Sequence, residues 1–284
     1  MATTLKANMF VPQVATAMAT AVFPDELALR FAGTPFVRVI PEDRIGNEGD
    51  TVTFPRFDVM SDFADLTENT AMSPDTLTTS TDTATVFAGG SAAEVTDFAS
   101  LSGRGNPSAE IGRQFARKAA EYLDSKLITE AYTTSLDVNA GATFSYDALV
   151  DAIFGQWGDK ALANVGGLVV HSKVAGDIMK AAEFATADKA GPGLNTAVHG
   201  FLGQVAGMPI YISDRLNVDT APTPDEYDCL VLKRGALGLM FQRELLIEYD
   251  RDVLNKSDII AADVRAAVHL FYDNPSPVIE IAWQ

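Results

Sequence analysis

The stretch from Gly207 to the C-terminus constrains the fold most, because short apolar runs alternate there with turn residues. The runs with the length and apolar content of strands are 207–213, 230–240, 246–254 and 277–283. Between residues 260 and 270 apolar residues occupy alternate positions, although a helix would align several of them too. A strand is favoured because strand-like runs flank this segment. The last third is therefore predicted to be mainly β-sheet.

A polar segment over residues 50–98 opens with the strand-like run Thr51–Phe57 and returns through Thr83–Phe87. This pattern predicts a long β-hairpin that projects from the body of the protein. Because an isolated two-stranded hairpin is marginal in water, it needs another surface to lie on. A second copy of the chain is the most economical surface, with Arg56 pairing with one of its acids. The candidate subunit contacts here are Phe54, Arg56 and Phe57.

Two helices are predicted before the β-rich part of the chain. In the first, apolar residues at spacings of three and four form one face, and Pro24 follows the helix. That face needs a cover, and a contact with another copy is expected; its residues are Val11, Val14, Met18 and Val22.

The second helix is predicted to begin at Asn106-Pro107 and to run for about 25 residues, or ~37 Å. Its apolar stripe consists of Ile111, Phe115, Ala119, Tyr122, Leu123 and Leu127. The polar residues assigned to positions off this stripe are Arg113, Arg117, Glu121 and Asp124. Of these, Arg113 and Arg117 are further candidate subunit contacts. Between this helix and the last third, a helix over 145–161, a strand over 168–171 and a helix over 172–184 indicate an α/β unit.

Few residues of this chain suit catalysis or cofactor binding. The formal net charge of -17 argues against a nucleic-acid binder, which needs a basic surface. None of His171, His199 and His269 has metal-ligand spacing, and Cys229 is the single cysteine. No catalytic, metal or cofactor-binding residue is therefore predicted.

An acidic cluster surrounds one arginine at residues 248–252. It could be read as a divalent-cation or general acid/base site, but an ion-paired loop at a subunit contact is favoured. The residues assigned to that contact are Glu248, Asp250, Arg251 and Asp252.

The order of these parts resembles the α+β fold of tailed-bacteriophage major capsid proteins, also called the Johnson fold and shared with herpesvirus capsid floors and encapsulins. The local matches are Gly207–Asp214, Arg234-Gly235-Ala236, and Glu248–Leu254 followed by a long strand and a final turn containing proline. The resemblance covers essentially the whole chain in architecture and not in invariant residues.

The resemblance implies five parts: an N-terminal arm, an extended hairpin called the E-loop, a spine helix, an axial A-domain and a peripheral P-domain. The boundaries are 1–33 for the arm, 34–49 for the start of the P-domain, 50–98 for the E-loop, 99–144 for the P-domain with the spine helix, 145–228 for the A-domain, and 229–284 for the remaining A-domain and P-domain strands. Residues 50–98 contain no lysine, so the covalent E-loop crosslink of some relatives is not expected.

The function implied by the resemblance is structural. The chain is expected to assemble into pentamers and hexamers of an icosahedral shell that encloses double-stranded viral DNA, made in the host cytoplasm and located in the virion. Expected partners are other copies, a separate scaffolding protein because Met1 leads directly into the arm, a portal and a decoration protein. DNA would lie nearby without specific contacts, and no membrane is involved. The alternatives are an encapsulin shell around an enzyme cargo and a cytosolic α/β enzyme with its site near Asp250 and His171.

Overall fold

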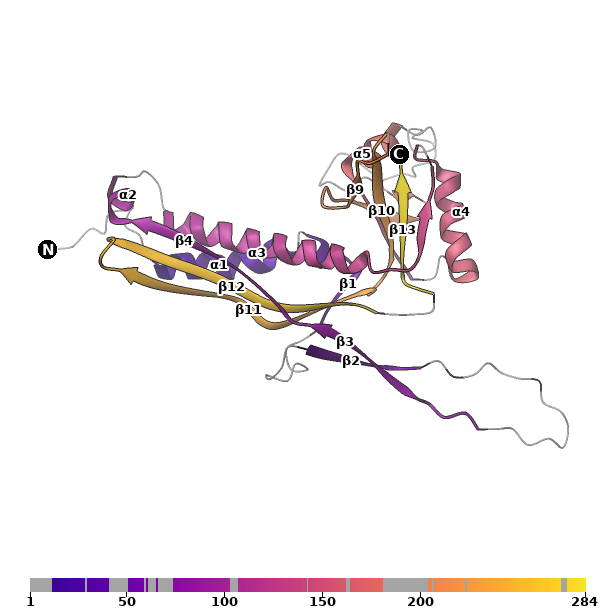
Figure 1. Cartoon of the computed structure of the whole chain (residues 1–284), viewed down its shortest axis with the longest axis horizontal. Coiled ribbons are helices and arrows are strands. Elements are labelled where there is room, and N and C mark those ends of the chain that lie inside the picture. Colours follow the sequence, from indigo (N-terminus) through magenta and orange to yellow (C-terminus); the bar gives the residue numbers. More distant parts are fainter. Residues whose placement is uncertain are drawn as a thin grey trace.

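The computed structural model describes residues 12–28, 30–40, 51–58, 60, 65, 74–102, 107–141, 143–161, 164–180, 204–205, 207–222, 224–271 and 275–284. Figure 1 shows an elongated body, a compact unit at one end of it and a hairpin that projects away from both. The α+β fold class predicted from the sequence is confirmed.

The elongated body is a four-stranded sheet in the order β1-β11-β12-β4. Its strands are β1 (Val37–Ile40), β4 (Phe87–Thr96), β11 (Leu237–Asp252) and β12 (Ser257–Leu270). The strands β11, β12 and β4 are antiparallel neighbours, whereas β1 lies parallel to β11. The strand preferred for residues 260–270 is thus confirmed, because alternate residues from Ile260 to Leu270 are buried on one face.

Two helices cover that face of the sheet: α1 (Pro12–Ala28) and α3 (Pro107–Ala131). The predicted length of 25 residues for the second helix is confirmed, as is its start at Pro107. Apolar side chains of both helices and of β11 and β12 form one core, which includes Phe23, Leu123, Leu127 and Val264. The long helix thus forms the spine of the body.

The compact unit is a seven-stranded sheet in the order β5-β13-β10-β6-β8-β7, with β9 paired to β10. Its strands are β5 (Asp137–Asn139), β6 (Val165–Val170), β7 (Gln204–Val205), β8 (Met208–Ile212), β9 (Val218–Asp219), β10 (Glu226–Lys233) and β13 (Val278–Trp283). Two helices, α4 (Tyr146–Trp157) and α5 (Ser172–Lys180), pack against this sheet, and a 3-10 turn, η3 (Gly158–Lys160), follows α4. The helix predicted over 145–161 therefore ends four residues early.

The hairpin consists of β2 (Thr51–Phe57) and β3 (Thr79–Thr85), which are antiparallel. Its outgoing strand agrees with the prediction, and its projection from the body is confirmed (Figure 1). The returning strand begins earlier than predicted. After Thr85 the chain joins the four-stranded sheet as β4, which begins at Phe87 and ends at the short helix α2 (Asp97–Ser102).

The first helix differs from its prediction in two respects. It continues through Pro24 to Ala28, where a 3-10 turn, η1 (Phe31–Gly33), follows. Its most buried line is Ala15, Ala19 and Phe23, while Val14, Met18 and Val22 are half-buried and Val11 lies outside the described residues. The reason is close helix packing. A Cβ atom added to Gly112 of α3 would lie 2.2 Å from the backbone oxygen of Ala15, so small residues face one another there.

Candidate functional site

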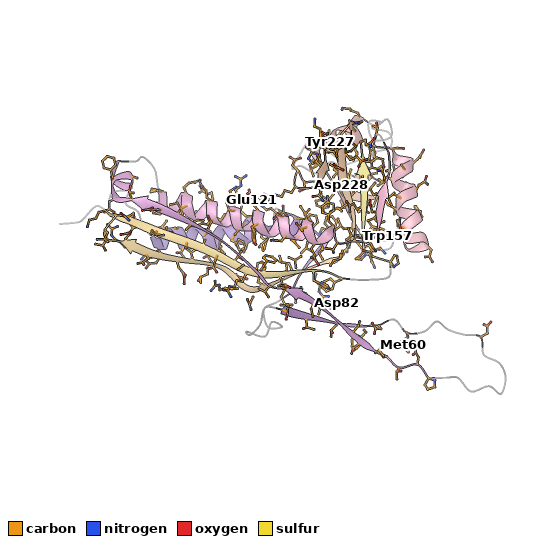
Figure 2. The ribbon with its side chains drawn as sticks, viewed as in Figure 1. Met60, Asp82, Glu121, Trp157, Tyr227 and Asp228 are labelled. Carbon is orange, nitrogen blue, oxygen red and sulfur yellow. The ribbon has the colours of Figure 1, made fainter. Side chains whose placement is uncertain are left out.

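Exposed apolar side chains at the two projecting ends of the molecule are the features that most resemble binding surfaces. On the hairpin, Phe57 is 71% exposed, and Met60 and Leu77 are also exposed beyond the paired strands. Figure 2 shows Met60 well away from the body. Large apolar side chains in such positions indicate surfaces that another macromolecule covers.

The second exposed apolar group lies at the far end of the long sheet. There the turn between β11 and β12 carries Leu254, 93% exposed, and α2 carries Phe98, 82% exposed. The amide of Asp97 donates a hydrogen bond to the backbone oxygen of Lys256 at 2.9 Å, which holds α2 beside this turn. Val253 and Tyr249 of the same end are exposed as well. We call these residues the sheet tip.

The base of the hairpin is fixed to the chain's own body. Phe54 is buried and its ring stacks on the ring of His269, with 4.9 Å between centroids. It also meets Phe271 edge-on at 5.8 Å. Phe54 therefore contacts its own chain in this structure, and Phe57 is left exposed on the same strand. Only the backbone of Arg56 is described, so its predicted ion pair is not tested.

The acidic cluster at 248–252 is the end of strand β11 and not the predicted loop. Arg251 donates to the Asp97 carboxylate at 2.7 and 3.0 Å and to Asp258 at 2.9 Å, so its partners belong to its own chain. These bonds raise the pKa of Arg251 and lower that of Asp97. Asp252 accepts bonds from the amides of Leu254 and Asn255 and so closes the turn. Asp250 accepts from the Arg251 amide, and Glu248 is exposed opposite Ala261.

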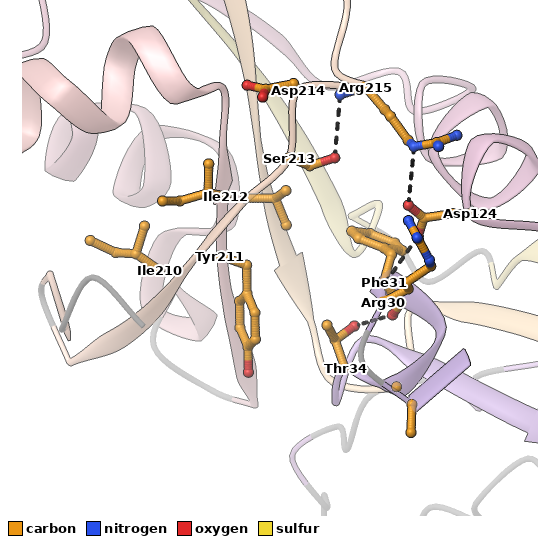
Figure 3. A pocket seen from close by; sticks show the side chains of 13 residues that line it. Arg30, Phe31, Thr34, Asp124, Ile210, Tyr211, Ile212, Ser213, Asp214 and Arg215 are labelled. Carbon is orange, nitrogen blue, oxygen red and sulfur yellow. Dashed lines mark hydrogen bonds and ion pairs between the residues drawn. The ribbon is translucent and has the colours of Figure 1, made fainter. Parts of the chain in front are cut away.

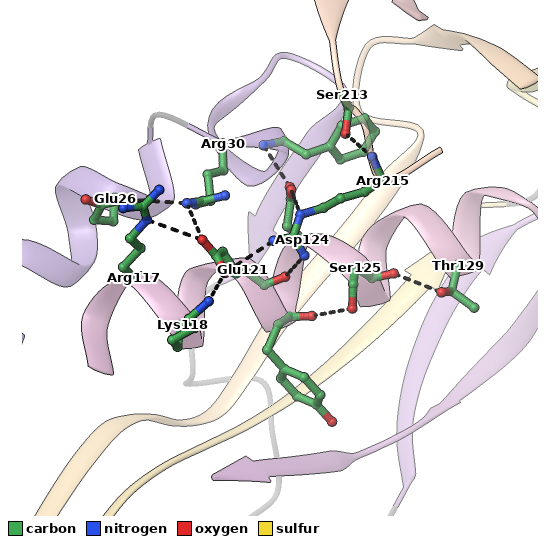
Figure 4. Close-up of polar contacts among 12 residues, drawn as sticks. Glu26, Arg30, Arg117, Lys118, Glu121, Asp124, Ser125, Thr129, Ser213 and Arg215 are labelled. Carbon is green, nitrogen blue, oxygen red and sulfur yellow. Dashed lines mark hydrogen bonds and ion pairs between the residues drawn. The ribbon is translucent and has the colours of Figure 1, made fainter. Parts of the chain in front are cut away.

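On the spine helix, Glu121 is the centre of a network of cations (Figure 4). Its carboxylate lies 3.1 Å from Arg30, 3.3 Å from Arg117, 2.9 Å from Lys118 and 3.4 Å from Arg215. The hydrogen bond from Lys118, with the charges of Lys118, Arg30 and Arg215, lowers the pKa of Glu121. The predicted contact residue Arg117 is thus paired within its own helix and remains largely exposed.

The neighbouring carboxylate is an unexpected feature. Asp124 was assigned to a position off the apolar stripe, yet it is buried and accepts a hydrogen bond from the Phe31 amide at 3.0 Å. Burial raises its pKa in spite of that bond. A helix position on the polar side of a stripe becomes buried when another segment, here the turn after α1, lies over it. Arg113, the other predicted spine contact, pairs with Glu110 at 2.8 Å and is exposed.

No arrangement suited to catalysis emerges from the described residues. Within them, no group of three or more His, Cys, Asp or Glu side chains is placed to hold a metal ion. Asp250 and His171, the centre of the alternative enzyme interpretation, belong to different parts of the fold: Asp250 lies in β11 of the long sheet, and His171 directly follows β6 in the compact unit. The single thiol, Cys229, is buried. None of the described helices combines the length and apolar character needed to span a membrane.

No family model matches the sequence. A curated relative is the major capsid protein of Staphylococcus phage phiMR11, which is 28% identical over 270 residues, 94% of this chain and 92% of the relative. Solved structures with the same architecture include one from Mycobacterium phage Che8, with 18% identity, a TM-score of 0.63 and coverage of 84% and 85% of the two chains. The capsid of Ralstonia phage GP4 matches with 14% identity, a TM-score of 0.65 and coverage of 89% and 90%.

The chain is therefore similar over most of its length to a phage major capsid protein, and its fold is that of phage capsid structures. The recognition made from the order of strands and helices is therefore confirmed. The sheet tip lies at the end of the body opposite the compact unit, whereas the hairpin projects away from the body on the side of the compact unit (Figure 1).

Proposed function

We propose that this chain is a structural capsid protein, whose copies assemble into the icosahedral shell of a tailed-phage virion around double-stranded DNA. Its contribution is geometric and not catalytic. A surface on one copy meets a different surface on the next, so that rings and then a closed lattice form. Many modest contacts add through multivalency to a durable shell.

The observation that carries this proposal is the hairpin. It contacts its own chain at the base, through Phe54, while Phe57 and Leu77 further out are exposed. A two-stranded hairpin with an exposed apolar side chain is stable when another surface covers it. We assign that surface to an adjacent copy, with pentamers and hexamers as the assembling units.

The remaining parts of the proposal concern the domain boundaries and the partners. The arm comprises residues 1–33, the E-loop 50–98, and the A-domain 145–228 with later strands, while the other residues form the P-domain. A separate scaffolding protein, a portal and a decoration protein are the partners we assign to the shell. The sheet tip, together with Glu248, Asp250, Arg251 and Asp252, is a second surface for contact between copies.

The test compares two variants on the same exposed face of β2: Phe57→Ser and, as a matched control, Thr53→Ser. The purified proteins are followed by sedimentation and negative-stain electron microscopy across a salt series, since salt screens repulsion between chains of charge -17 beyond ~8 Å. The wild type and Thr53→Ser are expected to form rings or closed shells. Phe57→Ser is expected to reduce particle yield at least tenfold without changing thermal unfolding.

Two outcomes would count against this proposal. A wild-type chain that stays monomeric across the series, with and without a crowding agent, would contradict the shell itself. Normal particle yield from Phe57→Ser would contradict the role of the hairpin but not the shell itself. Removal of residues 1–23 is a poor test of the arm, because it deletes Ala15, Ala19 and Phe23 from the chain's own core.

A further inference from the structure

The chain crosses between the elongated body and the compact unit at one place, beside the apolar core that the two share. The crossing segments are 132–136, 234–236 and the described parts of 271–277. Short bonds hold them together: Thr134 Oγ1 donates to the Val278 backbone oxygen at 2.6 Å, and the Phe271 amide donates to that of Ala236 at 2.9 Å. All of these lie beside the C-terminal end of the spine helix, so this region has the form of a hinge.

A second connection lies away from that hinge. Arg215 follows β8 in the compact unit and reaches the spine helix, where its Nη1 donates to the backbone oxygen of Glu121 at 2.8 Å. Its Nη2 is 3.4 Å from the Glu121 carboxylate and its Nε is 3.7 Å from that of Asp124. Glu121 precedes Ala131, the last residue of α3, by ten positions, which is about 15 Å along the helix. A contact at that distance from the hinge restrains rotation of the compact unit relative to the elongated body.

The same two carboxylates also hold the end of the arm. Arg30 reaches Glu121 at 3.1 Å, and the Phe31 amide bonds to Asp124 at 3.0 Å. Beside them lies a hollow of about 530 Å³, lined by Arg30, Phe31, Thr34, Asp124, Tyr211 and Arg215 among others (Figure 3). At this edge the two bodies are held by polar side chains next to open space, while buried side chains of the compact unit, among them Val169, Leu230 and Leu232, pack into the core of the spine helix.

We propose that Arg215, Glu121 and Asp124 form a latch that sets the tilt of the compact unit relative to the spine helix, with the chain crossings as its hinge. The apolar contacts near the crossings, such as Phe36 against Tyr211 at 5.1 Å between ring centroids, keep the two bodies together when the latch opens. Opening it therefore allows a limited rotation and leaves both bodies folded. In the proposed shell, this tilt would set the angle at which neighbouring copies meet, a consequence that rests on the proposed function.

The test measures tilt in the unassembled full-length chain, so it does not depend on shell formation. Spin labels are attached to Gln114→Cys on α3 and Phe154→Cys on α4, both exposed positions, while Cys229 is buried. Pulsed electron resonance then gives the distribution of distances between them. Arg215→Ala is expected to widen this distribution at least 1.5-fold. Arg113→Ala is the matched control, since it removes an arginine whose ion pair is with Glu110 of the same helix.

A distribution for Arg215→Ala that matches the wild type would overturn the latch, and so would equal widening by Arg113→Ala. Arg215→Lys is the second variant, which keeps the charge but loses the two-pronged contact with Glu121. It is expected to give an intermediate width, and it serves as the test if Arg215→Ala fails to fold. Particle yields of the same variants are measured separately, so failure of the latch and failure of the shell remain distinguishable.

Discussion

The two large sheets of this chain are both mainly antiparallel, but they bury their residues differently. In the compact unit, β10 is buried on both faces: Cys229 and Val231 face α4 and α5, while Leu230 and Leu232 join the core of the spine helix. In the long sheet, helices α1 and α3 cover one face. The other face is covered near Met240 by the base of the hairpin, while Ala261 and Arg265 on it are exposed.

The difference shows which part of the molecule is complete and which part needs neighbours. A sheet buried on both faces has its core within one chain. A long sheet with one open face, an exposed apolar tip and a projecting hairpin has surfaces whose covers lie outside the chain. Assembly is therefore expected to change the long sheet and the hairpin more than the compact unit.

Thiol reactivity gives the largest expected contrast between the two regions. Burial raises the pKa of Cys229 to about 12, and its side chain is fully buried in the compact unit. A cysteine introduced by Phe57→Cys on the hairpin would be exposed and would ionise normally. Because a thiol must be exposed and ionised to react, Cys229 is expected to react on the order of a thousandfold or more slowly.

The measurement is the time course of labelling by a disulfide reagent in Phe57→Cys, where the two thiols of one molecule are compared directly. In denaturant both should react at the same rate, which is the internal control. Comparable rates in the folded protein would show that the compact unit opens readily, and the comparison between the sheets would fail.

Two helical glycines, Gly112 beside the long sheet and Gly155 in the compact unit, allow the two regions to be compared by their effect on the free energy of unfolding. Gly112→Ala would place a methyl group 2.2 Å from the Ala15 backbone oxygen, so α1 must move away from the spine. We expect a loss of about 1–3 kcal/mol in the free energy of unfolding. Gly155→Ala in α4 meets nothing within 4 Å and should gain about 0.5–1 kcal/mol through helix propensity. Denaturant titration measures both.

A neutral Gly112→Ala would mean that α1 is loosely held and free to cover another copy, as the sequence analysis expected. A strong loss from Gly155→Ala would indicate that α4 is constrained by contacts other than those seen here. The pair therefore tests whether the helices of the long sheet are bound more tightly than those of the compact unit.

The order of elements was predictable because local chemistry determines it. Asn106-Pro107 indicated the start of the spine helix, and the alternation from Ile260 to Leu270 gave the strand β12. The position of α1 was not predictable from its own pattern. The larger apolar residues Val14, Met18 and Val22 suggested one buried face, but contact with Gly112 favours the smaller Ala15 and Ala19.

The polar contacts were harder to predict, because their partners are far apart in sequence. Arg251 was expected to contact another copy, yet its partner Asp97 lies 154 positions away in the same chain. Asp124 is buried only because the turn after α1 lies over it. For Arg251 the residue type indicated an ion pair and tertiary folding determined the partner, whereas for Asp124 the sequence indicated only a polar position off the apolar stripe.

Three carboxylates on one face of the compact sheet give it a pH dependence. Asp137 and Glu280 are partners on neighbouring strands, and Asp228 lies diagonally across on β10. Burial, followed by the charges of Asp228 and Asp137, raises the pKa of Glu280 to about 7. Burial also raises the pKa of Asp228. The folded state therefore holds protons at the Glu280 and Asp228 carboxyls at pH values where the unfolded chain has released them.

The sign of the effect follows from these protons. Stability from a raised carboxyl pKa is fully present below about pH 4.5, the unfolded value, and is lost as pH rises to about 7. Glu280→Gln removes the titrating group and should therefore stabilise the protein at pH 8. The expected gain over the wild type is about 1–2 kcal/mol, after allowance for solvent that screens this half-buried group. The gain should disappear near pH 4.5.

Denaturant titrations at several pH values measure this gain, with Glu94→Gln on the exposed side of β4 as the matched control in the long sheet. If Glu94→Gln gave the same pH-dependent gain, the effect would reflect the net charge of -17 and not the local cluster. A difference between Glu280→Gln and the wild type that does not change with pH would mean that folding does not raise the pKa of Glu280. A gain confined to Glu280→Gln would show that partial burial of this acid in the compact sheet lowers the free energy of unfolding at pH 8.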